Sequence, residues 1–147
     1  MAFGVNTISI LGNLTRDPEL RFTPNGTPVA SFGIAVNRRV QDRKTGEWVN
    51  DVDFFNVIAW FKLAENCAES LSKGDRVLVT GRLSQRSWED KDGQKKSVVE
   101  IIASVVAPSL EFASCKIERN PRISPDELQK SAEFDEELEI SDEDIPF

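Results

Sequence analysis

Cations and aromatic rings recur together in two stretches of strand-like sequence. They are Arg82, Arg86 and Trp88 in one stretch, and Phe54 and Trp60 in the other. Alternate side chains of a strand share a face, so each set lies on one side. Single-stranded nucleic acid is bound by this combination, because cations follow the phosphates and exposed rings stack on bases at about 1–3 kcal/mol per base. A solvated charged face with one isolated Trp is the simpler interpretation, which the recurrence disfavours.

The stretch 53–61 is short, β-branched and aromatic, which is typical of a strand. A small antiparallel sheet usually turns one face to water, yet both faces of this stretch carry large apolar side chains. We therefore expect one face to line the core and the other to meet a ligand. Burial in a second core or a subunit interface is the alternative. Two apolar faces are more than one small core needs, so this stretch also favours self-association. The faces are Phe55, Val57, Ala59 and Phe61, and Phe54, Asn56, Ile58 and Trp60.

The rest of the chain supplies further strands and one helix. Polar and apolar residues alternate in the strand stretches, with Gly12 marking a bulge or a close backbone approach, whereas Leu63, Cys67 and Leu71 recur at helical spacing before Gly74. Five strands with a short helix between the third and the fourth is the element order of an all-β, OB-fold barrel, although periodicity alone also allows other small barrels. The expected strands are 6–14, 29–36, 53–61, 76–88 and 96–106, with the helix within 62–74 and an extra C-terminal strand over 110–117.

Charge divides the chain into two parts. Residues 1–122 hold 17 Lys and Arg against 15 Asp and Glu, whereas residues 123–147 hold one Lys against 10 acidic residues. We expect a folded binding and oligomerisation domain over 1–122 and a disordered acidic tail over 123–147. The tail ends in an acidic run, an apolar ring and a free carboxylate, which fits docking to a partner better than solubilisation alone. This tip is Asp142, Glu143, Asp144, Ile145, Pro146 and Phe147.

The composition argues against catalysis. The chain has no His, which removes the commonest general base and zinc ligand, and Cys67 and Cys115 form no C-x-x-C pair. Carboxylates at predicted turns and strand ends suggest Mg²⁺ ligands of a nuclease, but no activating base accompanies them, so solvated surface charge is the favoured interpretation. We expect no enzyme, no metal and no cofactor. The carboxylates are Asp51, Asp53, Glu89, Asp90 and Asp92.

The N-terminus lacks both a charged leading segment and a long apolar run. This predicts neither a signal peptide nor a membrane span. Two widely spaced cysteines fit a reducing compartment, so we expect the cytoplasm.

Two separate signatures make the chain similar to a known family. It closely resembles the bacterial single-stranded DNA-binding proteins over residues 3–117 and again over 141–147, where the acidic run precedes Ile-Pro-Phe. The order of the two signatures makes the resemblance specific. The motifs of the first region are GNL at 12–14, DPELRF at 17–22, PNG at 24–26, KLAE at 62–65, KG at 73–74, VTGRL at 79–83 and RSW at 86–88.

The resemblance implies an OB fold, usually a homotetramer, that coats single-stranded DNA with little sequence preference. It also implies roles in replication, recombination and repair at the nucleoid, with the acidic tip recruiting genome-maintenance enzymes. The implied contacts are Phe54, Trp60 and Trp88 for stacking and Lys62, Lys73 and Arg86 for phosphates, to which the basic pattern adds Arg82, Arg38 and Arg39.

Three departures from the family pattern bear on function. Many members have a further Trp where this chain has Val40, and Trp48 is an unaligned candidate to replace it. The usual Gly/Pro/Gln-rich linker is nearly absent, which raises the effective concentration of the tip at the DNA. PSL at 108–110, followed by Phe112, resembles the actinobacterial branch, in which an added C-terminal strand clamps subunits together.

Three other functions remain open from the sequence. An OB-fold enzyme such as a nuclease would cleave a strand in the presence of Mg²⁺. An OB-fold adaptor of the replication restart machinery would bind its protein partner and contact DNA only weakly. An RNA-preferring protein is a nearer neighbour, since nothing in these residues reads or rejects the 2′-OH.

Overall fold

The computed structural model describes residues 2–121, so the predicted acidic tail and its tip lie outside the described residues. Burial alternates over Ile8–Leu14 and at the start of Arg76–Glu89, as expected for strands with one side towards a core. In chain order the elements are β1 (Ile8–Leu14), β2 (Glu19–Phe22), β3 (Pro28–Gln41), β4 (Trp48–Trp60), α1 (Phe61–Ser70), β5 (Arg76–Glu89) and β6 (Lys95–Pro108).

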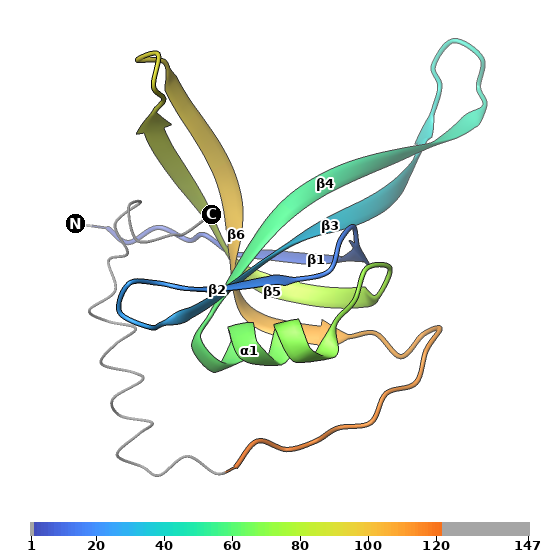
Figure 1. Cartoon of the computed structure of the whole chain (residues 1–147). Helices are drawn as coiled ribbons and strands as arrows, with labels where there is room; N and C mark the ends of the chain where they lie inside the picture. Colours follow the sequence, from blue (N-terminus) through green and yellow to red (C-terminus); the bar gives the residue numbers. More distant parts are fainter. Residues whose placement is uncertain (1, 122–147) are drawn as a thin grey trace.

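Five of these strands close into a ring, which Figure 1 shows above helix α1. The neighbours are β1, β5, β6, β4 and β3, and β1 returns to β3 through the pairs Asn13–Ala35 and Leu14–Ile34. β4 and β6 pair in parallel, whereas the other neighbours are antiparallel. Among the described strands β2 pairs with β3 alone and lies outside the ring. The predicted all-β OB-fold barrel, with its helix between the third and fourth ring strands, is confirmed.

The ring closes at Gly12, where the sequence predicts a bulge or a close backbone approach. The close approach is confirmed, because a Cβ atom here would overlap the carbonyl oxygen of Ala35 on β3. Glycine is therefore required where β1 turns from β5 towards β3.

Aliphatic side chains and one phenylalanine fill the barrel. Phe32 and Ile34 on β3 are fully buried, as the alternation in 29–36 predicts. Cys67 on α1 and Leu71 just after it close one end of the core. Cys67 is thus a core residue, as its place on the helical stripe predicts. The other buried members are Ile10, Leu14, Val57, Val77, Val79 and Ile101.

Helix α1 follows β4 without a connecting loop. Phe61 has a φ of 60°, a left-handed conformation that residues other than glycine rarely adopt, and it turns the chain from strand to helix. The helix ends at Ser70, earlier than the end predicted just before Gly74. Gly74 instead adopts a φ of 93° in a separate turn, in which the Ser72 N–H donates to the Asp75 carboxylate.

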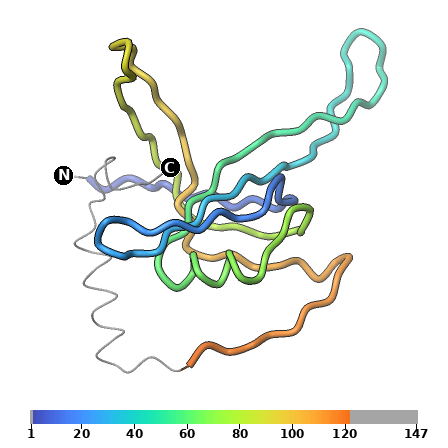
Figure 2. The backbone as a smooth tube through the Cα atoms, viewed as in Figure 1, coloured from blue at the N-terminus to red at the C-terminus, as the bar shows by residue number. Residues whose placement is uncertain are grey.

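Two hairpins extend beyond the barrel and diverge, as Figures 1 and 2 show. We call the distal part of β3–β4 the first arm and the distal part of β5–β6 the second arm. Pairing in the first arm continues to Gln41 and Trp48, so both ends of the basic stretch 38–48 are strand and residues 42–47 form the loop between them. Pairing in the second arm continues to Glu89 and Lys95. The arms carry side chains well away from the core.

The chain leaves β6 without forming the extra strand predicted over 110–117, and the additional strand of the sheet is β2 instead. A strand needs a partner edge, and no described strand pairs with this segment. Arg76 holds its start: the Arg76 carbonyl oxygen accepts the Ser109 N–H, and the guanidinium lies over the Phe112 ring. The hydrogen bond from Arg76 to Glu111, 3.1 Å long, lowers the pKa of that carboxyl.

Candidate nucleic-acid interface

The register of the sheet decides which side chains share a side. Residues paired across two strands point to the same side, and alternate residues along one strand do so too. Trp48, Phe54 and Trp60 on β4 therefore lie on one side. Arg39 lies there as well, since its partner Asn50 belongs to the same alternate set. We call this side of the arms, and of the sheet between them, the arm face.

The arm face continues from the first arm onto the second. Ile58 on β4 pairs with Ile102 on β6, and Ile102 pairs with Arg82 on β5. Arg82, Arg86 and Trp88 occupy alternate positions of β5 and share that side. The structure therefore brings the two ring-and-cation stretches of the sequence together on one continuous side of the sheet.

The three predicted stacking rings differ in exposure. Phe54 is 73% exposed and Trp88 is 41% exposed. Trp60 is only 9% exposed, because its ring packs with Val29 and Ile58 in a second, smaller apolar cluster on the arm face. A base can reach Phe54 and Trp88 directly, whereas stacking on Trp60 needs its ring to leave this cluster. At this end of β4 the alternative of a second core therefore holds.

Arg86 is held by a buried carboxylate. Its Nε donates to Oε1 of Glu100 at 2.8 Å, and Glu100 on β6 is only 5% exposed. The guanidinium carbon of Arg86 lies 5.2 Å from the centroid of the Trp88 ring. A cation over an indole face is attracted to it, so Arg86 helps to position the Trp88 ring. Glu100 offsets the charge of Arg86.

Two other predicted cations on the arm face have no ion-pair partner among residues 2–121. They are Arg82 on β5 and Arg39 on β3, and both side chains are exposed. Neither charge is offset by a carboxylate within 4.0 Å, so each is available to a phosphate.

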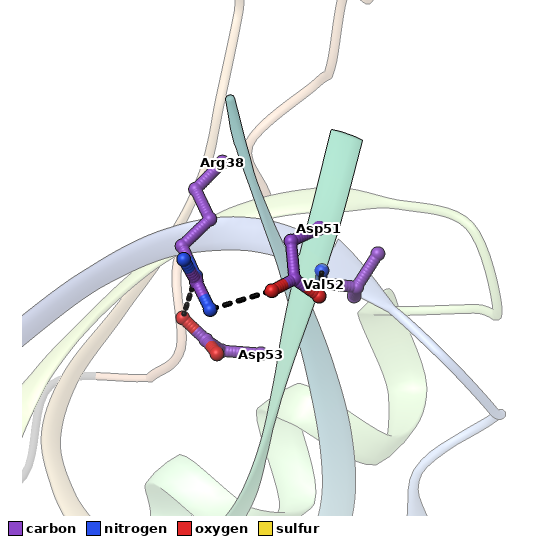
Figure 3. Close-up of polar contacts among 4 residues, drawn as sticks. All are labelled: Arg38, Asp51, Val52 and Asp53. Carbon is purple, nitrogen blue, oxygen red and sulfur yellow. Dashed lines mark hydrogen bonds and ion pairs between the residues drawn. The ribbon is translucent and has the colours of Figure 1, made fainter. Parts of the chain in front are cut away.

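The register places Arg38 on the opposite side of the first arm, where Figure 3 shows it beside Asp51 and Asp53. Its Nη2 lies 2.6 Å from Oδ2 of Asp51, and its Nε lies 3.1 Å from Oδ2 of Asp53. Asp51 Oδ1 also accepts the backbone N–H of Val52. The two carboxylates thus offset the charge of the Arg38 guanidinium. Asp51 and Asp53, which the sequence suggests as Mg²⁺ ligands, are therefore paired with an arginine. Phosphate contact by Arg38 stays a prediction, and this geometry does not favour it.

The two lysines implied by the family resemblance lie away from the arm face. Lys62 is in the first turn of α1, and its Nζ lies 3.2 Å from Oε2 of Glu65. Lys73 is exposed in the turn after α1, where its backbone N–H donates to Asp17. Figure 1 shows α1 on the far side of the barrel from the two arms. Contacts at these lysines therefore require DNA to continue around the barrel.

Two arginines on the arm face are not singled out by the sequence analysis. Arg21 on β2 pairs with Val29, whose other partner is Trp60. Arg16 donates to the carbonyl oxygen and the hydroxyl of Ser31, at 3.2 and 3.1 Å. The sequence holds a signal for Arg21, because Glu19 and Arg21 alternate with apolar residues between the turn motifs at 17–18 and 24–26, as in a short strand. Arg16 gives no such signal, because only the folded chain brings it to β3.

Comparison with known proteins shows the family to which the chain belongs. The sequence model of the Single-strand binding protein family matches residues 5–109, which include the barrel and both arms. The chain belongs to this family. The single-stranded DNA-binding protein of Corynebacterium glutamicum is 51% identical over 123 residues, which are 83% of this chain and 55% of that protein. The single-stranded DNA-binding protein of Mycobacterium tuberculosis H37Rv is 48% identical over 120 residues, 81% of this chain and 73% of that protein.

These relatives confirm the predicted resemblance to the actinobacterial branch of the family. The match spans little more than half the length of the Corynebacterium protein. A solved structure described as a Plasmodium falciparum SSB complex with ssDNA is also similar, with a TM-score of 0.69 and 27% sequence identity. That similarity covers 74% of this chain and 98% of the other.

The described part of this family member offers no site for a metal ion. Among residues 2–121, no group of three or more His, Cys, Asp or Glu side chains is placed to hold one. Asp90 is engaged by its own turn, since its carboxylate accepts the backbone N–H groups of Asp92 and Gln94. No helix in this range is long and apolar enough to cross a membrane.

Proposed function

We propose that this chain binds and coats single-stranded DNA with little sequence preference and without catalysis. The observation that carries the proposal is the arm face, on which exposed rings and cations from both arms share one side of the sheet. Stacking tolerates every base because every base has a π-face, and the phosphates that cations contact are common to all nucleotides. The family match and the similarity to an SSB in complex with ssDNA support the same ligand.

The residues fall into two groups by how directly the structure supports a contact. Side chains on the arm face form the first group, in which Trp60 has to move before it can stack. The second group lies elsewhere on the surface and is reached only if the DNA wraps around the protein. The first group is Phe54, Trp60, Trp88, Arg39, Arg82 and Arg86, and the second is Lys62, Lys73 and Arg38.

Titration with oligo-dT tests this function through intrinsic Trp fluorescence and through the anisotropy of a fluorescein-labelled strand. We expect saturable quenching that persists at moderate salt, because salt screens phosphate contacts far more than stacking. Absence of both signals at low salt would overturn the proposal and favour the protein-adaptor function. Equal affinity for oligo-U would show that the site does not distinguish RNA from DNA.

We further propose that the chain acts in replication, recombination and repair at the nucleoid, and that residues 142–147 recruit partner enzymes. An acidic run before an apolar ring supports docking into a basic, apolar pocket. Deleting Phe147 should leave the affinity for oligo-dT unchanged while abolishing co-sedimentation with a purified replication or repair enzyme. Loss of both activities to the same extent would contradict a separate docking tip.

Self-association into a homotetramer is also proposed. The sequence argument from the two faces of 53–61 is weakened, because Val57, Ile58 and Ala59 are all buried within one chain. Better support comes from an exposed apolar patch, in which Leu11 on β1 pairs with Leu78 on β5, next to Val105 on β6. Sedimentation equilibrium should give the mass of a tetramer, and a monomer at micromolar concentration would contradict the proposal.

A further inference from the structure

Trp48 is an exposed ring far from the barrel core. It is the first residue of β4, it pairs with Gln41 at the end of the first arm, and it is 60% exposed. Within the described chain it belongs to no buried apolar cluster. A Trp in such a position contributes little to the core, so its ring is available to a ligand.

Trp48 and Phe54 lie on the same line along the arm face. They are six positions apart on β4, an even number that points both rings to one side, and six strand residues span about 20 Å. Asp51 and Asp53 point to the opposite side, where Arg38 engages them. A nucleic-acid strand that continues from Phe54 along β4 therefore reaches Trp48 without passing these two carboxylates.

Arg39 is placed against the Trp48 ring. Its guanidinium carbon lies 5.5 Å from the ring centroid, because Arg39 pairs with Asn50 and is the diagonal neighbour of Trp48. The adjacent Arg38 is bound by two carboxylates, whereas Arg39 takes part in no ion pair among residues 2–121. The contact orders both side chains and leaves the charge of Arg39 available to a phosphate.

We propose that Trp48 and Arg39 form an additional base-stacking site at the end of the first arm. The indole stacks on a base while the guanidinium contacts a neighbouring phosphate of the same strand. The inference rests on the proposed binding of single-stranded DNA and extends its path beyond Phe54. It assigns this role to a residue outside the motifs that carry the family resemblance.

A variant in which Trp48 is the sole Trp tests the contact directly. Trp60→Phe and Trp88→Phe keep a ring at the other two positions, so the double variant retains stacking groups there. We expect oligo-dT to quench the emission of Trp48 in parallel with the rise in anisotropy of a fluorescein-labelled strand. A rise in anisotropy without quenching would overturn this site and leave the proposed function intact. Absence of binding by the wild-type chain would instead contradict the proposed function.

Alanine variants of the full chain measure what the site contributes. Trp48→Ala should weaken the affinity for a long oligo-dT by about fivefold or more, since one stacked base is lost. Val49→Ala is the matched control, because Val49 is also exposed on this arm but points to the opposite side. Circular dichroism checks that both variants fold. Equal affinities of the two variants would overturn the inference, whatever the double variant shows.

Discussion

Glu100 and Arg86 form the least exposed ion pair in the described part of the chain, with side chains that are 6% and 16% exposed. Oε1 of Glu100 lies 2.8 Å from Nε of Arg86. The pair lies under the arm face, and Arg86 in turn contacts the ring of Trp88. The position of a ring that we assign to base stacking therefore depends on a buried carboxylate.

Removing this carboxylate should destabilise the protein. Glu100→Ala removes the buried carboxylate that pairs with a largely buried guanidinium, and breaking a buried pair costs about 3–5 kcal/mol. We expect a decrease of this order in the free energy of unfolding, measured by urea denaturation. Glu65→Ala is the control, because the exposed Lys62–Glu65 pair contributes only about 0.5 kcal/mol. Equal decreases for both variants would show that the Arg86–Glu100 pair is not structurally important.

The salt dependence of binding should separate the arginines. Each phosphate contact on a single strand contributes about 0.7 to the slope of log affinity against log salt concentration. Arg82→Ala should lower the slope by about this amount. Arg38→Ala should change it less, because Asp51 and Asp53 already offset that charge. The reverse order would place the DNA on the opposite side of the first arm.

Trp60 and Trp88 should behave differently when replaced by alanine. From the sequence, both changes are expected to weaken binding without unfolding. The burial of Trp60 revises this: Trp60→Ala should lower the free energy of unfolding by about 3–5 kcal/mol. Trp88→Ala should affect stability little but weaken oligo-dT binding by about tenfold. Unfolding curves and anisotropy titrations of both variants distinguish the roles, and a stable Trp60→Ala variant would mean that its ring leaves the cluster readily.

The two cysteines should differ in reactivity. Burial raises the pKa of the Cys67 thiol from 9.0 to about 11, whereas Cys115 is exposed. At pH 8 a thiol reagent should modify Cys115 rapidly and Cys67 only after denaturation. Since the unfolded thiol ionises first, stability should be unaffected below pH 9.0 and should fall as the pH rises from 9.0 through about 11. Rapid modification of both thiols in the folded protein would contradict the core position of Cys67.

The barrel could be predicted because its signals are local. Alternation in 29–36 identifies the side of β3 that carries Phe32 and Ile34, and the change to helical spacing locates α1. The predicted strand over 110–117 fails for a non-local reason. Its apolar residues suit a strand, but no described strand offers an edge to pair with, and Arg76 holds the start of the segment elsewhere.

The site is less predictable than the fold because neighbours in sequence can have opposite environments. Arg38 and Arg39 look alike in a basic run, yet the register pairs one with Asp51 and the other with Asn50. The side on which each arginine lies, and the residue that it pairs with, thus depend on the register of β3 and β4 in the first arm. Composition does not reveal this register. The burial of Trp60 likewise depends on Val29, a residue of another strand.

The contact between β1 and β3 has a consequence for behaviour at high local density. A protein that lines up along a DNA strand brings many identical sheets close together, and unpaired strand edges would join them into aggregates. Closure of the ring leaves β2 as the strand outside it, and β2 is four residues long with charged Glu19 and Arg21. Short, charged edges resist such pairing. Within the barrel, the same closure that encloses the core therefore also leaves few unpaired strand edges to which another copy could pair.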